Sequence, residues 1–204
     1  MDFSKNGFKK AHYFFPVKEE LPPFIQLLSC HISSTIKHNE ELVILCIGTD
    51  KITGDCLGPL VGTKLQEQSL PIPVYGTLKH PVHAVNFTST LAALRQQYQH
   101  PFFLVIDAAL GPADKIGCVS LSCSPIYPGK GIFRPLPPVG NISITGIISE
   151  ADGSAEANLP YTRLYLVDKL AAFISKCILT GQFEKIEQKK TSRFIMPHKI
   201  RRNE

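Results

Sequence analysis

Apolar and polar positions follow one another along the chain with the spacings of both helices and buried strands. Leucine and isoleucine recur at helical spacing over residues 24–37, and again over residues 159–179, where the apolar stripe is the strongest in the sequence. Continuous apolar runs at 42–47 and 102–106 are typical of strands buried on both faces, as in a parallel sheet. The same patterns predict shorter strands at 74–77, 117–122 and 142–148, and helices at 59–68 and 86–98, the latter with Asn86 at its N-cap.

The order of these elements predicts the fold class. Helices and strands alternate until two further strands and a last helix close the chain, which indicates an α/β three-layer sandwich with a mainly parallel central sheet. Residues 1–22 are mixed in character and predict an irregular, loosely attached leader. We expect residues 23–184 to form a single α/β domain and residues 185–204 to form a basic, flexible tail.

The net charge of +5 belongs to that tail. Residues 185–204 hold seven Lys or Arg and two Glu, whereas residues 1–184 hold fifteen of each sign. A basic balance confined to a tail predicts no nucleic-acid groove in the core. No apolar run approaches the roughly 20 residues of a membrane span, and no secretory signal follows Met1. We therefore expect a cytoplasmic protein without a membrane partner.

The six cysteines give no sign of a metal site. Their spacings contain no C-x-x-C pair, so a cysteine-based zinc site has no support. Without a secretory signal, we expect reduced and mostly buried thiols. The sequence predicts no metal and no cofactor.

Two acidic segments follow the two longest apolar strands. Residues 48–59 follow the first strand and include Asp50 and Asp55, and Asp107 directly ends the run at 102–106. In an open α/β sheet, ligands bind beyond the carboxyl ends of the strands. If the two strands are neighbours, Asp55 and Asp107 face each other across the crevice.

Two opposed carboxyl groups support hydrolysis without a covalent intermediate. Held close together they share one proton, so that the charged member takes a proton from water and the protonated member polarises a carbonyl. Loop donors around Gly48, Gly54 and Gly111 are candidates for holding an oxyanion, with Asp50 and Lys130 as candidates for substrate binding.

Structural roles compete with these assignments. Asp55 is suited to cap the helix near Pro59, Asp50 to close a turn, and Asp107 to accept backbone N–H groups. The thiolate of Cys56 is disfavoured beside Asp55, and we expect it to pack. The glycine-rich loop is not a Walker loop, because Lys and Ser or Thr do not follow its last glycine. His80 and His83 are expected to be ordinary loop residues.

The ordered set of motifs resembles the YyaC-type sporulation proteins of spore-forming Firmicutes. The carrying segments are Gly48–Pro59, Ile106–Ala108, Tyr127–Gly131 and Ile142–Ile147. These proteins are similar to the germination protease and, more distantly, to hydrogenase maturation endopeptidases. The resemblance implies a phosphorylase/hydrolase-like fold and places the two catalytic aspartates of the germination protease on Asp55 and Asp107. In the maturation enzymes a histidine completes an acidic metal site; Tyr127 stands at that position here, which favours a metal-free pair.

The resemblance implies an aspartic-type endopeptidase of sporulation or germination. Its partner would be a protein or peptide substrate, with small acid-soluble spore proteins as candidates, in the cytoplasm of the forespore or the spore core. Two alternatives stay open: a non-catalytic binding or scaffold protein on the same fold, and a metal-dependent peptidase. Homo-oligomerisation is also left open.

Overall fold

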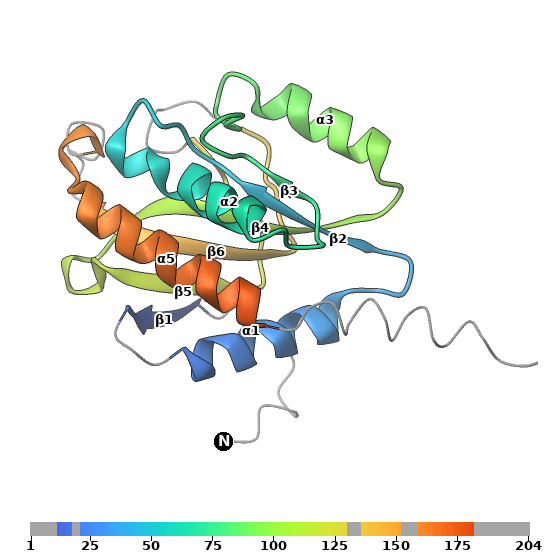
Figure 1. Ribbon diagram of the computed structural model, residues 1–204, viewed down its shortest axis with the longest axis horizontal. Coiled ribbons are helices and arrows are strands. Elements are labelled where there is room, and N and C mark those ends of the chain that lie inside the picture. Colours follow the sequence, from blue (N-terminus) through green and yellow to red (C-terminus); the bar gives the residue numbers. More distant parts are fainter. Residues whose placement is uncertain (1–11, 18–20, 130–135, 152–158, 182–204) are drawn as a thin grey trace, which may run out of the picture.

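A six-stranded sheet with helices on both faces forms the body of the molecule. The computed structural model describes residues 12–17, 21–129, 136–151 and 159–181 (Figure 1). Its strands are β1 (His12–Pro16), β2 (Glu41–Cys46), β3 (Val74–Tyr75), β4 (Pro101–Gly111), β5 (Cys118–Ser122) and β6 (Ile142–Glu150). Its α-helices are α1 (Pro22–Thr35), α2 (Leu57–Glu67), α3 (Phe87–Gln97) and α5 (Leu164–Thr180), and its short 3₁₀ helices are η1 (Thr53–Cys56), η2 (Ala113–Lys115) and η4 (Leu159–Tyr161). Within the described ranges, no helix is long and apolar enough to cross a bilayer.

The sheet is parallel at its centre. In the strand order β1-β5-β6-β4-β2-β3, the strands β3, β2, β4 and β6 run parallel, while β5 and β1 are antiparallel to their neighbours. Strands β2 and β4 pair without interruption from Glu41 opposite Pro101 to Cys46 opposite Ile106. The two apolar runs are therefore adjacent central strands, as their composition predicted.

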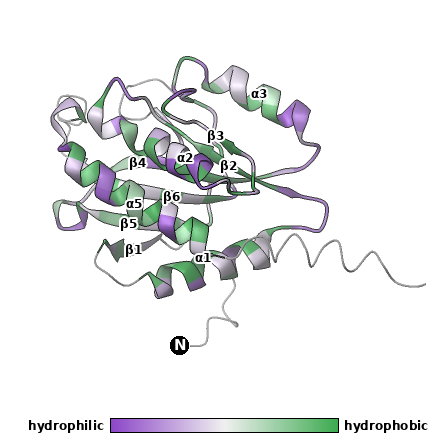
Figure 2. Cartoon of the chain, in the orientation of Figure 1, coloured by the Kyte–Doolittle hydropathy of each residue, from purple (hydrophilic) through white to green (hydrophobic). Residues whose placement is uncertain are grey.

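Helices cover the two faces unequally, which gives three layers. Leu42 and Ile44 of β2 belong to a core shared with α1, α2 and α5. Val43 and Leu45 point to the opposite face and pack with α3. Figure 1 shows α2 and α5 lying along one face of the sheet, where Lys64 Nζ and Asp168 Oδ1 join them at 3.1 Å. In Figure 2 the central strands carry the hydrophobic colour expected of strands buried on both faces. The predicted three-layer α/β fold is confirmed.

The expectation of an irregular leader is wrong for residues 12–16. These residues form β1, which pairs antiparallel with β5 and sets Phe14 opposite Ser120. The pairing supplies partners for backbone groups of β5 that an open sheet edge would leave bare. It also brings the ring of Phe15 within 5.1 Å of the ring of Phe24 in α1, centroid to centroid. The rest of the predicted leader up to residue 11, and the basic tail at 185–204, lie outside the described residues.

Two predicted details also differ: the end of β4 and the hydrogen bonding of Asn86. Strand β4 does not end at Asp107 but continues to Gly111, because β6 runs beside it and pairs with it beyond the end of β2. Asn86 occupies the N-cap of α3 but makes no side-chain bond to that helix. Its Oδ1 instead accepts the His83 N–H at 2.8 Å, and its Nδ2 donates to the Pro81 carbonyl at 2.9 Å. The side chain thus closes the preceding loop.

Candidate active site

The adjacency of β2 and β4 brings the two predicted acids to one end of the sheet. Strand β2 stops opposite Ile106, one residue before Asp107. From there the chain turns through Gly48 into η1, which contains Asp55 and contacts β4. Both aspartates keep part of their surface accessible to solvent. The two acids therefore lie at the same end of the sheet, near enough for the charge of Asp55 to act on the carboxyl group of Asp107.

Asp107 lies within β4, in register with Thr145 of β6. One of its carboxyl oxygens, Oδ1, accepts the backbone N–H of Ala108 at 2.8 Å. Burial raises the pKa of Asp107 well above its ordinary value, and the negative charge of Asp55 raises it further; the Ala108 bond opposes this only in part. Burial and the charge of Asp55 therefore favour the protonated form of Asp107.

Asp55 sits in the loop that leads to α2. Its Oδ2 accepts the Thr49 N–H at 2.9 Å, and its own carbonyl oxygen accepts the same N–H at 3.1 Å. Burial raises the pKa of Asp55 to about 6, and the Thr49 bond limits that rise. At neutral pH this carboxyl is therefore mostly ionised, whereas its charge favours the protonated form of Asp107.

The hydrogen bonds leave one oxygen of each carboxyl for a ligand. Backbone N–H groups occupy Oδ2 of Asp55 and Oδ1 of Asp107. Within the described part of the chain, Oδ1 of Asp55 and Oδ2 of Asp107 have no protein partner. One ionised and one protonated carboxyl with open oxygens can activate a water and polarise a carbonyl.

Gly48 and Gly54 allow close approach of the backbone to its neighbours. Gly48 has φ +137°, and a Cβ there would fall on the carbonyl oxygen of Asp55. Its N–H donates to the Val82 carbonyl at 2.8 Å, so it is not available to an oxyanion. A Cβ on Gly54 would lie 2.8 Å from Ile148 Cδ1. The two glycines let the loop of Asp55 pack tightly against its neighbours.

Among the described residues, no hydrogen bond joins the other predicted site residues, Asp50 and Gly111, to either carboxyl. Gly111 is four residues beyond Asp107 on β4, about 13 Å along the strand, and its carbonyl accepts the Ala151 N–H. Asp50 is exposed, and its charge acts on Cys56, whose pKa is raised first by burial and then by Asp50 and Asp55. The charge of Asp50 is not among the causes that raise the pKa of Asp55 or of Asp107. Lys130 lies outside the described residues.

The histidines and the motif tyrosine near this edge do not complete a metal site. Nδ1 of His83 accepts the Val85 N–H at 3.3 Å, and His80 is exposed in the same loop. Tyr127 is 54% exposed. Over the ranges that the structure describes, no group of three or more His, Cys, Asp or Glu side chains is arranged to hold a metal ion.

Hydroxyl side chains stand in a row beside Asp107, which the sequence pattern did not predict. Thr145 pairs with Asp107 on one side and with Ser120 of β5 on the other. Paired residues of neighbouring strands point to the same face, so the three polar side chains form a line across the sheet. Alternation within residues 142–148 placed Thr145 on one face of its strand, but only the register puts it beside Asp107.

Comparisons with known proteins show which family the chain belongs to. Residues 17–177 match the family described as protein of unknown function (DUF1256). The chain is also 38% identical over 148 residues to the uncharacterized protein YyaC of Bacillus subtilis (strain 168), covering 71% of this chain and 72% of the relative. The matched span contains both aspartates and the strands that carry them. The chain therefore belongs to the DUF1256 family and is a protein of the YyaC type.

Proposed function

We propose that this protein is an aspartic-type endopeptidase of sporulation or germination, related to the germination protease. The observation that supports the proposal is the coupled carboxyl pair: Asp55 with a pKa of about 6, and Asp107 held protonated by burial and by the charge of Asp55. Opposed carboxyls with separated pKa values suit acid–base hydrolysis. The pair titrates as a unit, so the roles below describe its dominant protonation state at neutral pH.

The pair would hydrolyse an amide in two stages, each with two proton transfers. The free Oδ1 of ionised Asp55 takes a proton from water as the water oxygen bonds to the peptide carbonyl carbon. The proton on Asp107 Oδ2 passes to the carbonyl oxygen, giving a neutral tetrahedral diol. Asp55 then gives its proton to the leaving nitrogen as the C–N bond breaks, and the diol returns a proton to Asp107. Water is consumed, a carboxylic acid and an amine are released, and the pair recovers its starting state.

This scheme assigns stabilisation of the oxyanion to Asp107. The Gly48 N–H, a candidate donor from the sequence, is bonded to Val82. Gly111 lies too far along β4 from the pair. A protonated carboxyl donating to the developing oxyanion is a strong, charge-assisted hydrogen bond.

Cleavage of small acid-soluble spore proteins tests the proposal. Purified wild type and Asp107→Asn are incubated with these proteins, and the fragments are identified by mass spectrometry. The wild type should cleave and Asp107→Asn should not. Asp114→Asn is the matched control, because Asp114 is an exposed aspartate in an ion pair with Lys115 at 2.7 Å. Equal cleavage by wild type and Asp107→Asn removes the catalytic assignment, and loss of cleavage with a chelator favours the metal-dependent alternative.

A specific observation also favours a second candidate, a non-catalytic binding or scaffold protein. Each aspartate accepts a backbone N–H of its own segment, Thr49 for Asp55 and Ala108 for Asp107. Carboxylates in such positions order loops in many proteins without reacting. If that is their only role, Asp55→Ala should cost about 1 kcal/mol of stability and no peptide bond should be cleaved by the wild type.

A further inference from the structure

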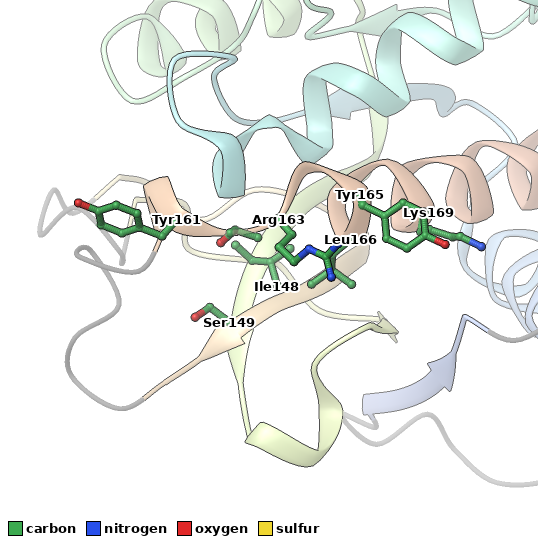
Figure 3. A pocket seen from close by; sticks show the side chains of 8 residues that line it. Ile148, Ser149, Tyr161, Arg163, Tyr165, Leu166 and Lys169 are labelled. Atoms are coloured by element: carbon green, nitrogen blue, oxygen red, sulfur yellow. The ribbon is translucent and has the colours of Figure 1, made fainter.

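A groove lies where the end of β6 meets the start of α5. It has a volume of about 490 Å³, within the range of ligand sites. Ile148 and Ser149 of β6 line one side, and residues 161–163, 165, 166 and 169 line the other. Figure 3 shows the Arg163, Tyr165 and Lys169 side chains gathered along α5, with Ile148 below them.

The groove is cationic. Arg163 and Lys169 are its charged lining residues, and no acid lines it. The guanidinium carbon of Arg163 lies 5.9 Å from the centroid of the Tyr165 ring, and Lys169 Nζ lies 5.3 Å from it. Among the residues that the structure describes, neither cation is paired with a carboxylate. The Tyr165 ring thus attracts both cations, and both keep their positive charge.

The same segment carries exposed apolar surface. Tyr161 is 86% exposed, Leu164 59% and Tyr165 62%. Tyrosine and arginine are the residue types enriched where proteins bind partners, and a cluster of exposed apolar side chains rimmed by charge marks such a place. The groove therefore offers aromatic and aliphatic contact together with two cations.

The groove is joined directly to the loop of the pair. Gly54, which precedes Asp55, approaches Ile148 and Leu159 so closely that a Cβ would lie 2.8 Å from a side-chain carbon of each. Ile148 lines the groove. Leu159 is the first residue of η4, and the last residue of η4, Tyr161, also lines the groove. The loop of Asp55 and the groove therefore share Ile148 as a neighbour.

We infer that this groove binds an acidic stretch of the polypeptide substrate, which rests on the proposed peptidase function. Carboxylate side chains would pair with Arg163 and Lys169, and apolar neighbours would lie on Tyr161 and Tyr165. A polypeptide fits better than a nucleic acid, because two cations over an apolar floor do not form the continuous track that a phosphate backbone requires.

Binding to the full-length Asp107→Asn protein tests the inference apart from cleavage. The probe is a short fluorescein-labelled peptide in which glutamate alternates with leucine and glycine. Its matched partner has glutamine at each glutamate. Fluorescence anisotropy is measured for Asp107→Asn alone and with Arg163→Gln, Lys169→Gln or both. Lys176→Gln is the control, because Lys176 is an exposed lysine on the same helix outside the groove.

The glutamate peptide should bind more tightly than the glutamine peptide. Each groove substitution should weaken the affinity about threefold to fivefold, with a larger loss for the double variant, and added salt should reduce the difference. Lys176→Gln should leave the affinity unchanged. Equal affinity for the two peptides, equal losses in the groove variants and in the control, or preferential competition by single-stranded oligonucleotide would overturn the inference.

Cleavage by the wild type is read separately, by mass spectrometry of the same peptides. Groove-dependent binding of the glutamate peptide, with no cleavage of that peptide or of any spore protein, counts against the peptidase proposal while the acidic-peptide site stands. Cleavage that depends on Asp107 but is equal for wild type and the double groove variant counts against the site while the peptidase proposal stands.

Discussion

Asp55 and Asp107 are electrostatically coupled at one end of the sheet, although Asp55 lies in η1 and Asp107 lies in β4. Burial and then the charge of Asp55 raise the pKa of Asp107 well above its ordinary range. Burial raises the pKa of Asp55 only to about 6, because Thr49 donates its N–H to that carboxylate. Burial and the charge of Asp55 therefore favour placing a shared proton on Asp107.

Replacing Asp107 by asparagine should lower the rate of peptide hydrolysis without lowering the melting temperature. The amide has the same shape but cannot transfer the proton, so we expect peptide hydrolysis to fall by about 10²–10⁴-fold. Removing a buried acid that strains the site should hold or raise the melting temperature. Thermal unfolding and cleavage assays on the same preparations check both. A large drop in melting temperature with full activity would contradict this prediction.

The pH dependence of cleavage should be bell-shaped. Asp55 must be ionised to accept a proton from water, so kcat/KM should rise as the pH increases through about 6. At higher pH Asp107 loses its proton and the rate should fall again. The measurement is kcat/KM for one peptide across the pH range. A profile that decreases steadily as the pH rises through 6 would be inconsistent with an ionised Asp55.

The stability of the fold should also depend on the charge of Asp55. Its pKa is raised from 3.8 to about 6, so the folded protein binds this proton more tightly than the unfolded chain. The resulting stabilisation is present at acid pH and is lost as the pH rises from about 4 through about 6. Asp55→Asn abolishes this loss, so wild type should lose about 1–2 kcal/mol relative to the variant over that window.

Urea unfolding of wild type and Asp55→Asn at several pH values measures this difference. Asp114→Asn serves as the control, because its exposed carboxyl should not reproduce the change near pH 6. A wild type that gains stability relative to Asp55→Asn between pH 4 and 6 would mean that the folded state depresses the pKa.

Gly48→Ala should destabilise the protein by about 2–4 kcal/mol. The substitution combines a left-handed backbone, φ +137°, with a Cβ that collides with the Asp55 carbonyl. Gly117 is the matched control: it has φ +83°, but a Cβ there would meet only Leu166 Cδ1, at 3.6 Å. Gly117→Ala should therefore cost only the backbone term, about 1–2 kcal/mol. Chemical denaturation of the two variants compares them, and equal losses would contradict the packing argument.

The sequence motifs predicted Asp55 and Asp107 as a pair, but they did not predict the roles of the glycines around them. The acids could be named because each follows a long apolar run, and parallel strands end at the same edge of a sheet. The roles of the glycines could not be named, because the hydrogen bond of Gly48 to Val82 joins segments that no local pattern relates. Gly111 was misplaced for a similar reason: the pattern did not show that β4 continues alongside β6 beyond Asp107.

The amino-acid sequence alone determined the α/β class, the two central strands and the pair of acids, because buried strands and amphipathic helices have characteristic local spacings. Tertiary structure alone decided that residues 12–16 complete the sheet, that Thr145 stands beside Asp107, and that a cationic groove adjoins the loop of Asp55. Strand order, register and burial depend on contacts between distant segments. The same is true of the unequal pKa values of the two aspartates, which arise from how deeply the fold buries each carboxyl and how near it brings them.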